Sequence, residues 1–96
     1  GIRLVLLNAQ RVLRGRALTS LLQAGEIHVE IAMLEGVGGV GNLLASIPLS
    51  CLLFGSYAPM FYFEAALIKL QESPLSEEQL RAIRSDNARR LLARNP

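Results

Sequence analysis

Cysteine and charge are both scarce in this sequence of 96 residues. Cys51 is the only cysteine, which excludes a disulfide framework and any zinc site built mainly from thiolates. Charged residues make up 19% of the chain and leave a net charge of +2, while 51% of the residues are hydrophobic. Apolar burial on this scale can offset the entropy of ordering the backbone, so we expect a single folded domain over residues 1–96.

Residues 36–63 contain no charged residue, and these 28 positions exceed the roughly 20 that a helix needs to cross a bilayer. Two prolines and several glycines interrupt the segment, and a broken backbone in lipid would leave polar groups without partners. We therefore expect no membrane span. No targeting segment is visible in the sequence either, and we expect a cytoplasmic protein.

Apolar patterning predicts three β/α units followed by a helical carboxyl terminus. Strands are expected over residues 3–7, 27–33 and 51–54, and helices over residues 11–24, 40–46, 60–71, 76–84 and 85–94. Ser76 and Gln79 form a predicted capping box, and Phe61, Ala65 and Ile68 are expected to face inward from their helix. Crossovers of a dozen or more residues imply parallel strands, so the expected fold class is α/β.

Three short parallel strands make an incomplete sheet. Parallel sheets are normally covered on both faces, and open edges favour aggregation. We therefore expect either part of a larger α/β protein or several copies that assemble to cover the apolar sheet residues. Those residues are Leu4, Leu6, Val29, Ile31, Leu52 and Phe54.

A glycine-rich turn follows the second predicted strand. Residues 36–41 match the dinucleotide pattern G-x-G-x-x-G and precede a helix. The next strand should end in an acidic residue that holds the ribose hydroxyls, and residues 51–56 contain none. The sequence therefore favours a strand-to-helix turn, with a nucleotide-binding half-fold as the weaker alternative.

Polar residues on or after the strands are candidates for a binding site. His28 and Glu30 share one face of the second strand, about 6.6 Å apart, and form either a satisfied pair or part of a pocket. Ser56 and Tyr57 follow the third strand, at the edge where α/β proteins place their sites. Together with Asn8 after the first strand, these residues are predicted to line a small polar pocket.

Arginine supplies nine of the ten basic residues. Five of them lie near the carboxyl terminus, at Arg81, Arg84, Arg89, Arg90 and Arg94. Acidic residues are interleaved with them and no aromatic residue lies nearby, which favours a solvated helix face over a nucleic-acid interface.

Two segments, with Leu-Ser-Glu-Glu at residues 75–78 between them, carry a resemblance to a known family, and the predicted strands at residues 4–7 and 27–33 are similar to two earlier strands of that family. Residues 52–59 are Leu-Leu-Phe-Gly-Ser-Tyr-Ala-Pro, and residues 87–92 are Asn-Ala-Arg-Arg-Leu-Leu. Both resemble the carboxyl-terminal end of the amidohydrolase-related metal-dependent hydrolases, whose last strand reads roughly L-L-F-G-[ST]-D-x-P and whose closing helix reads N-A-x-R-L-L. The resemblance implies the last three or so β/α units of a TIM barrel, a partial barrel.

The family's metal ligands are replaced in this sequence. The aspartate that ends the family's last strand corresponds to Tyr57, and the best match to a metal-binding histidine of an earlier strand is Asn8. The paired histidines of the family's first strand are absent. A divalent metal needs three or more well-placed N, O or S ligands, so we expect no metal and no other cofactor.

The resemblance thus predicts a carboxyl-terminal fragment of an amidohydrolase-type hydrolase that is inactive on its own. The alternative is a non-catalytic, self-assembling binding module, with the arginine-bearing helix outside. Expected partners are further copies of the chain or the remainder of a larger barrel, together with a small-molecule ligand; neither nucleic acid nor membrane is expected.

Overall fold

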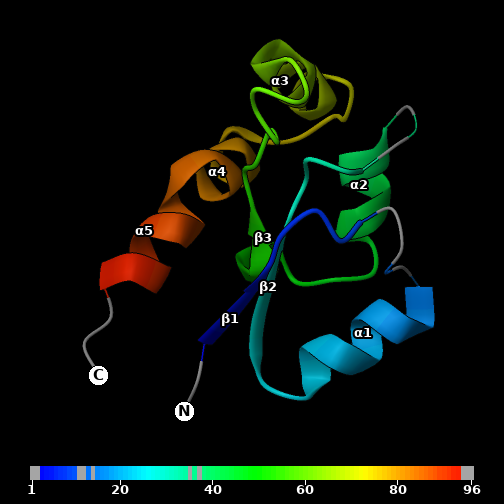
Figure 1. The fold of residues 1–96 in the computed structure, drawn as a ribbon, viewed down its shortest axis with the longest axis vertical. Helices are drawn as coiled ribbons and strands as arrows, with labels where there is room; N and C mark the ends of the chain where they lie inside the picture. Colours follow the sequence, from blue (N-terminus) through cyan, green and yellow to red (C-terminus); the bar gives the residue numbers. More distant parts are fainter. Residues whose placement is uncertain (1–2, 11–12, 14, 35, 37, 94–96) are drawn as a thin grey trace.

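The computed structural model describes residues 3–10, 13, 15–34, 36 and 38–93, and it places a parallel sheet between helices (Figure 1). The strands are β1 (Arg3–Leu6), β2 (Glu26–Glu30) and β3 (Leu52–Leu53), in the order β1-β2-β3. Both pairings are parallel, with Leu6 beside Val29 and Val29 beside Leu52. The predicted α/β class is confirmed.

Helices flank the sheet on both sides (Figure 1). α1 (Gly15–Gln23) and α2 (Gly39–Leu44) lie on one side, and α3 (Phe63–Gln71) lies beyond the carboxyl ends of the strands. A 3₁₀ turn, η1 (Leu49–Cys51), leads into β3. α4 (Glu77–Arg81), the π-helical segment η2 (Ala82–Asp86) and α5 (Asn87–Ala93) lie on the other side.

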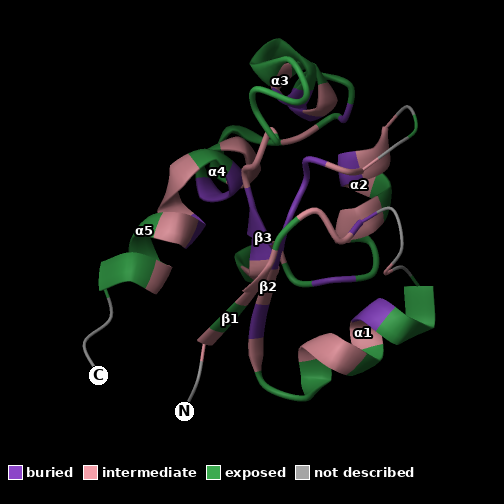
Figure 2. Ribbon diagram, viewed as in Figure 1, coloured by how far each residue is buried: buried purple, intermediate pink, exposed green. Residues whose placement is uncertain are grey.

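The main core lies along the sheet and receives side chains from α1, α2, α3 and η2. Figure 2 shows buried residues running along the strands and into the helices beside them. The cluster of buried residues consists of Leu18, Val29, Ile31, Val40, Ile47, Leu52, Leu70 and Ile83. Val29, Ile31 and Leu52 are therefore covered within one chain. Further copies are not needed to cover these three residues, whereas Leu4 is 44% exposed and Leu6 and Phe54 are half-buried, so the assembly of several copies stays a prediction.

The second face of the sheet is covered in part by α5. Arg3 Nη1 of β1 donates to the carbonyl of Leu91 at 2.8 Å, and Asn87 Nδ2 donates to the carbonyl of Leu52 at 2.8 Å. Arg3 pairs with Glu26 in the sheet, and His28 follows Glu26 by two residues. Because side chains alternate along a strand, His28 lies on this same face. The helix thus reaches from β3 to the edge strand β1.

Strand β2 is shorter than predicted, because the chain turns at Glu30. The carboxylate of Glu30 accepts the N–H of Ala32 at 2.7 Å, and the N–H of Leu34 bonds to the carbonyl of Ile31 at 3.0 Å. These local bonds replace the ladder that residues 31–33 would otherwise continue.

The predicted capping box is confirmed. Ser76 Oγ accepts the N–H of Gln79 at 3.1 Å, and Gln79 Oε1 accepts the N–H of Ser76 at 2.9 Å. The predicted break at residue 85 is wrong, because α4, η2 and α5 follow one another directly. Ser85 Oγ donates to the carbonyl of Arg81 at 3.4 Å instead of capping a new helix.

Helix α3 begins at Phe63 and buries Ala66 and Leu70. The prediction that Phe61, Ala65 and Ile68 face inward is wrong, since all three are exposed. Within the described part of the chain, no helix combines the length and apolar character that crossing a bilayer requires.

Candidate functional site

A pocket of about 230 Å³ lies where the three strands end. Its lining consists of Val5, Leu7, Asn8, Glu30, Leu53, Phe54, Gly55 and Tyr57. We call it the carboxyl-edge pocket. The structure therefore brings together Asn8, Glu30 and Tyr57, three of the five predicted site residues, and surrounds them with apolar side chains.

Glu30 is the most deeply buried polar group of this pocket, with 4% of its surface exposed. Its Oε2 accepts the N–H of Asn8 at 2.5 Å, and its Oε1 accepts the N–H of Ala32 at 2.7 Å. Two N–H donors offset much of the cost of burying a carboxylate. Glu30 thereby ties the end of β1 to the turn after β2.

Gly55 makes room for that carboxylate. A Cβ built on Gly55 would lie 2.8 Å from Glu30 Cδ, closer than real Cβ contacts come. The sequence prediction missed this role. A glycine at the end of a strand, such as Gly55 after Phe54, often indicates that a neighbouring group lies close to the backbone.

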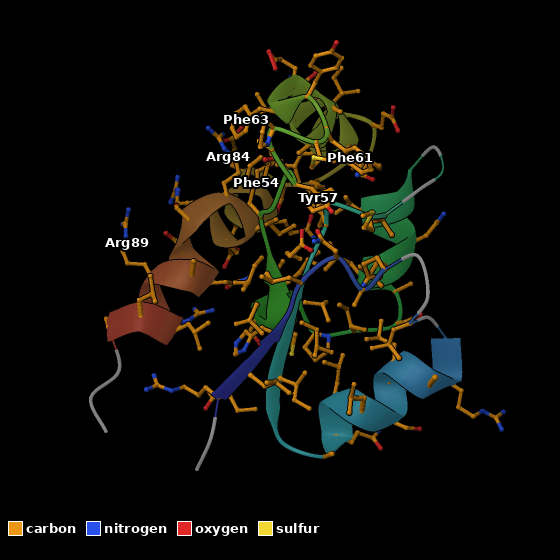
Figure 3. The ribbon with its side chains drawn as sticks, in the orientation of Figure 1. Phe54, Tyr57, Phe61, Phe63, Arg84 and Arg89 are labelled. Atoms are coloured by element: carbon orange, nitrogen blue, oxygen red, sulfur yellow. The ribbon has the colours of Figure 1, made fainter. Side chains whose placement is uncertain are left out.

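Asn8 and Tyr57 share an unusual backbone conformation at the rim of the pocket, each with φ of 57°. Asparagine adopts this left-handed region readily, whereas for tyrosine it costs on the order of 1–3 kcal/mol. The carbonyl of Tyr57 accepts the N–H of Phe61 at 3.1 Å, and the two rings meet edge to face with centroids 5.4 Å apart (Figure 3). These contacts hold Tyr57 at the pocket.

Lys69 of α3 is a further residue near this edge that the sequence prediction missed. Its Nζ donates to the carbonyl of Ile31 at 3.1 Å and to the carbonyl of Ala32. The helix is thus attached to the turn that follows Glu30, which no local sequence pattern indicates.

His28 lines a different cavity, of about 450 Å³, at the amino ends of β2 and β3. The lining of this amino-edge cavity consists of Gly25, Glu26, Ile27, His28, Ser50, Cys51, Asn87, Arg90 and Leu91. His28 and Glu30 therefore face two separate cavities, and the predicted pocket of five residues does not form as one unit. The Nδ1 atom of His28 is buried and has no hydrogen-bond partner among the described residues.

Ser56 does not line either cavity. Its Oγ accepts the N–H of Ala58 at 3.3 Å, a local bond that shapes the turn after β3. At the amino-edge cavity, burial raises the pKa of the Cys51 thiol, and a hydrogen bond with the Ser50 side chain opposes that rise.

The residues at the carboxyl edge do not fit the metal that the family resemblance implies. Within residues 3–10, 13, 15–34, 36 and 38–93, no three His, Cys, Asp or Glu side chains are grouped so that they could hold a metal ion. Asn8 and Tyr57, which the resemblance aligns with family ligands, carry an amide and a phenol, and Glu30 already accepts two backbone N–H groups.

The glycine-rich turn has its own structural role. Gly36 and Gly38 take φ values of 94° and 69°, which favour glycine. The N–H of Gly41, inside the short helix α2, donates to Ser73 Oγ at 2.9 Å. That N–H is therefore directed to a serine hydroxyl of the same chain. Residue 37 of the pattern lies outside the described residues.

Comparison with known proteins finds no matching protein family, no matching curated protein and no matching solved structure. The resemblance to the amidohydrolase-related family therefore rests on residues 52–59, 75–78 and 87–92 and on their spacing.

Proposed function

We propose that this chain is the carboxyl-terminal β/α portion of an amidohydrolase-type barrel that has lost its metal site, and that its carboxyl-edge pocket binds a small molecule without hydrolysing it. One observation carries the proposal. Asn87 Nδ2 donates to the carbonyl of Leu52 at 2.8 Å, so the two segments that resemble the family contact each other across 35 positions of sequence. Chance likeness in two separate segments would not require that contact.

The location of the pocket supports the same proposal. Barrel enzymes of the β/α type form their sites from the loops after the strands, and the turn after β3 brings Tyr57 to the pocket that Glu30 lines. The pocket offers carboxylate and phenol oxygens within an apolar wall. Such a lining suits the binding of a small molecule with a hydrogen-bond donor and an apolar body.

The test restores the family's ligands. The double variant Asn8→His with Tyr57→Asp places a histidine and an aspartate beside Glu30, and it should bind Zn²⁺ at least tenfold more tightly than the wild-type chain, measured by calorimetric titration. Aspartate tolerates left-handed backbone better than tyrosine, so this change should not strain the turn. The matched control is Asn8→His with Ser56→Asp, which moves the carboxylate one position.

Two results would contradict the proposal. The first is elemental analysis showing about one tightly bound metal per wild-type chain. The second is a folded double variant whose zinc affinity equals that of the control variant, because the positions would then not correspond to those of the family.

Self-association is the second candidate, and exposed apolar residues favour it. Met60 and Tyr62 are 71% and 85% exposed, and about half of Phe63 and Ile68 is exposed. At about 200 Å² for each large side chain, two copies could bury about 1,000 Å² here, the lower limit for a specific interface. Light scattering should then give a dimer that Tyr62→Ser weakens; a monomer of single-chain mass at 100-fold varied concentration would rule this out.

A further inference from the structure

The amino-edge cavity is built differently from the pocket at the other end of the sheet. Its walls come from the amino ends of β2 and β3 and from helix α5, and its volume of about 450 Å³ is within the range of small-ligand sites. The small-molecule site of the proposed function lies at the opposite end of the strands, and the resemblance assigns no role to this cavity, although Asn87, Arg90 and Leu91 of the resembling segment form part of its lining. Its lining includes the guanidinium of Arg90 and the imidazole of His28.

Arg90 is held in place by a relay of hydrogen bonds. Asn87 is 2% exposed, and its Nδ2 donates to the carbonyls of Leu49 at 2.7 Å and Leu52 at 2.8 Å, which fixes the direction of its Oδ1. Arg90 Nη2 donates to that Oδ1 at 2.5 Å. A guanidinium has five N–H donors, so the bond to Asn87 leaves others for a ligand while it restricts the side chain.

His28 supplies an imidazole to the same cavity. Its Nδ1 is buried with no hydrogen-bond partner in the described part of the chain. The ring carries a second nitrogen, Nε2, which as an N–H can donate to a bound group.

The charge around the cavity is positive on balance. Arg3 Nη1 donates to the carbonyl of Leu91, a lining residue, so a second guanidinium lies beside the cavity that Arg90 lines. Glu26 is the acidic residue of the lining, and it has an interaction partner in the structure. The two guanidinium groups outnumber the one carboxylate, and this excess of positive charge favours an anionic ligand.

We propose that the amino-edge cavity binds a small oxyanion, a carboxylate or phosphate group, between Arg90 and His28. The planar fork of a guanidinium matches two oxygens of either group, and the imidazole N–H can reach a further one. Leu91 lines another part of the wall, so the ligand is a small organic acid or phosphate ester with an apolar portion.

The chain carries its own reporters for the test. It has one histidine and one cysteine, and His28 and Cys51 both line the cavity. Inorganic phosphate and benzoate are titrated separately, at fixed pH and ionic strength, while the His28 Hε1 resonance is followed by NMR. A saturable shift is expected with at least one of the two, and the tighter one identifies the phosphate or carboxylate preference. Sodium chloride at equal ionic strength should give no saturable shift.

Variants of two adjacent arginines separate a site from general charge attraction. Arg90→Gln should weaken the binding at least tenfold, whereas Arg89→Gln, whose side chain extends from the outer side of α5 in Figure 3, should bind as the wild type does. Equal weakening in both variants, or a shift that grows linearly with every salt, would overturn the proposal.

A second measurement needs no variant and covers the case in which Arg90→Gln does not fold. The reaction of the Cys51 thiol with iodoacetamide, a neutral reagent, should slow with the same half-saturating anion concentration that the His28 resonance gives. Unchanged thiol reactivity at saturating anion would also contradict the proposal. Neither outcome depends on zinc binding at the carboxyl edge, so the two proposals fail independently.

Discussion

Replacing Asn87 by alanine should be among the most damaging single changes in this chain. The Asn87 side chain is buried, and its Nδ2 donates to two backbone carbonyls, those of Leu49 and Leu52, just before and within β3. Alanine keeps the helical backbone of α5 but removes both donors. The carbonyl of Leu52 would then be buried without this donor.

The magnitude follows from the two bonds. A buried acceptor left without its partner costs about 1–3 kcal/mol, so the loss of both bonds and of the packed amide should cost about 3–5 kcal/mol. The total stability expected for a chain of this length is roughly 5–14 kcal/mol. Asn87→Ala should therefore remove about a fifth or more of the free energy of unfolding.

Urea denaturation followed by circular dichroism measures this directly. The matched control is Arg89→Ala, an exposed position of the same helix, which should change the free energy of unfolding by less than about 0.5 kcal/mol. If Asn87→Ala costs less than about 1 kcal/mol with an unchanged m-value, water satisfies the two carbonyls. The attachment of α5 to β3 would then not be what holds the helix on this face.

Three further changes test other parts of the structure. Gly55→Ala should cost about 1–3 kcal/mol in urea denaturation because its Cβ meets the Glu30 carboxylate, whereas Gly25→Ala, which has open space around it, should cost far less. Ser76→Ala should cost about 1 kcal/mol by the same assay, through loss of the capping box. Burial raises the pKa of Cys51, so its contribution to stability is complete below about pH 8.5 and is lost as pH rises through the raised value. Between pH 8 and 10, urea denaturation should therefore show a smaller fall in the free energy of unfolding with rising pH for Cys51→Ala than for the wild type.

Much of the sheet could be predicted because its signal is local. Short apolar runs separated by helical segments imply parallel strands, and the structure places them in the order β1-β2-β3. The capping box was equally predictable, since Ser76 and Gln79 satisfy each other's backbone groups within four residues. In both cases the residues that decide the structure are neighbours in sequence.

The predicted bounds of helices and strands were wrong where one side chain could form either of two alternative hydrogen bonds. Ser85 followed by Asp86 suggested a helix start, but Ser85 bonds back to the carbonyl of Arg81 and the helix continues. Glu30 suggested one more alternating strand residue, but its carboxylate accepts the N–H of Ala32 and ends β2. A sequence pattern cannot decide between such bonds, because both are geometrically available to the same side chain.

The site prediction failed at His28 for a long-range reason. Alternation correctly places His28 and Glu30 on one face of β2, and by itself it implies a shared surface. Helix α5 comes from the far end of the chain and packs over the amino half of that face, where Asn87 and Arg90 join His28 in the cavity lining. The position of that helix depends on bonds to β3 that span more than 30 residues, which strand periodicity does not encode.

The two segments that resemble the hydrolase family therefore serve opposite ends of the sheet. The turn after β3 brings Tyr57 to the carboxyl-edge pocket, while Asn87 and Arg90 belong to the amino-edge cavity. The bonds of Asn87 to the chain around β3 involve neither Asn8 nor Tyr57. Substitutions at Asn8 and Tyr57 therefore leave the attachment of α5 intact, because the hydrogen bonds that hold this closing helix lie at the other end of the strands.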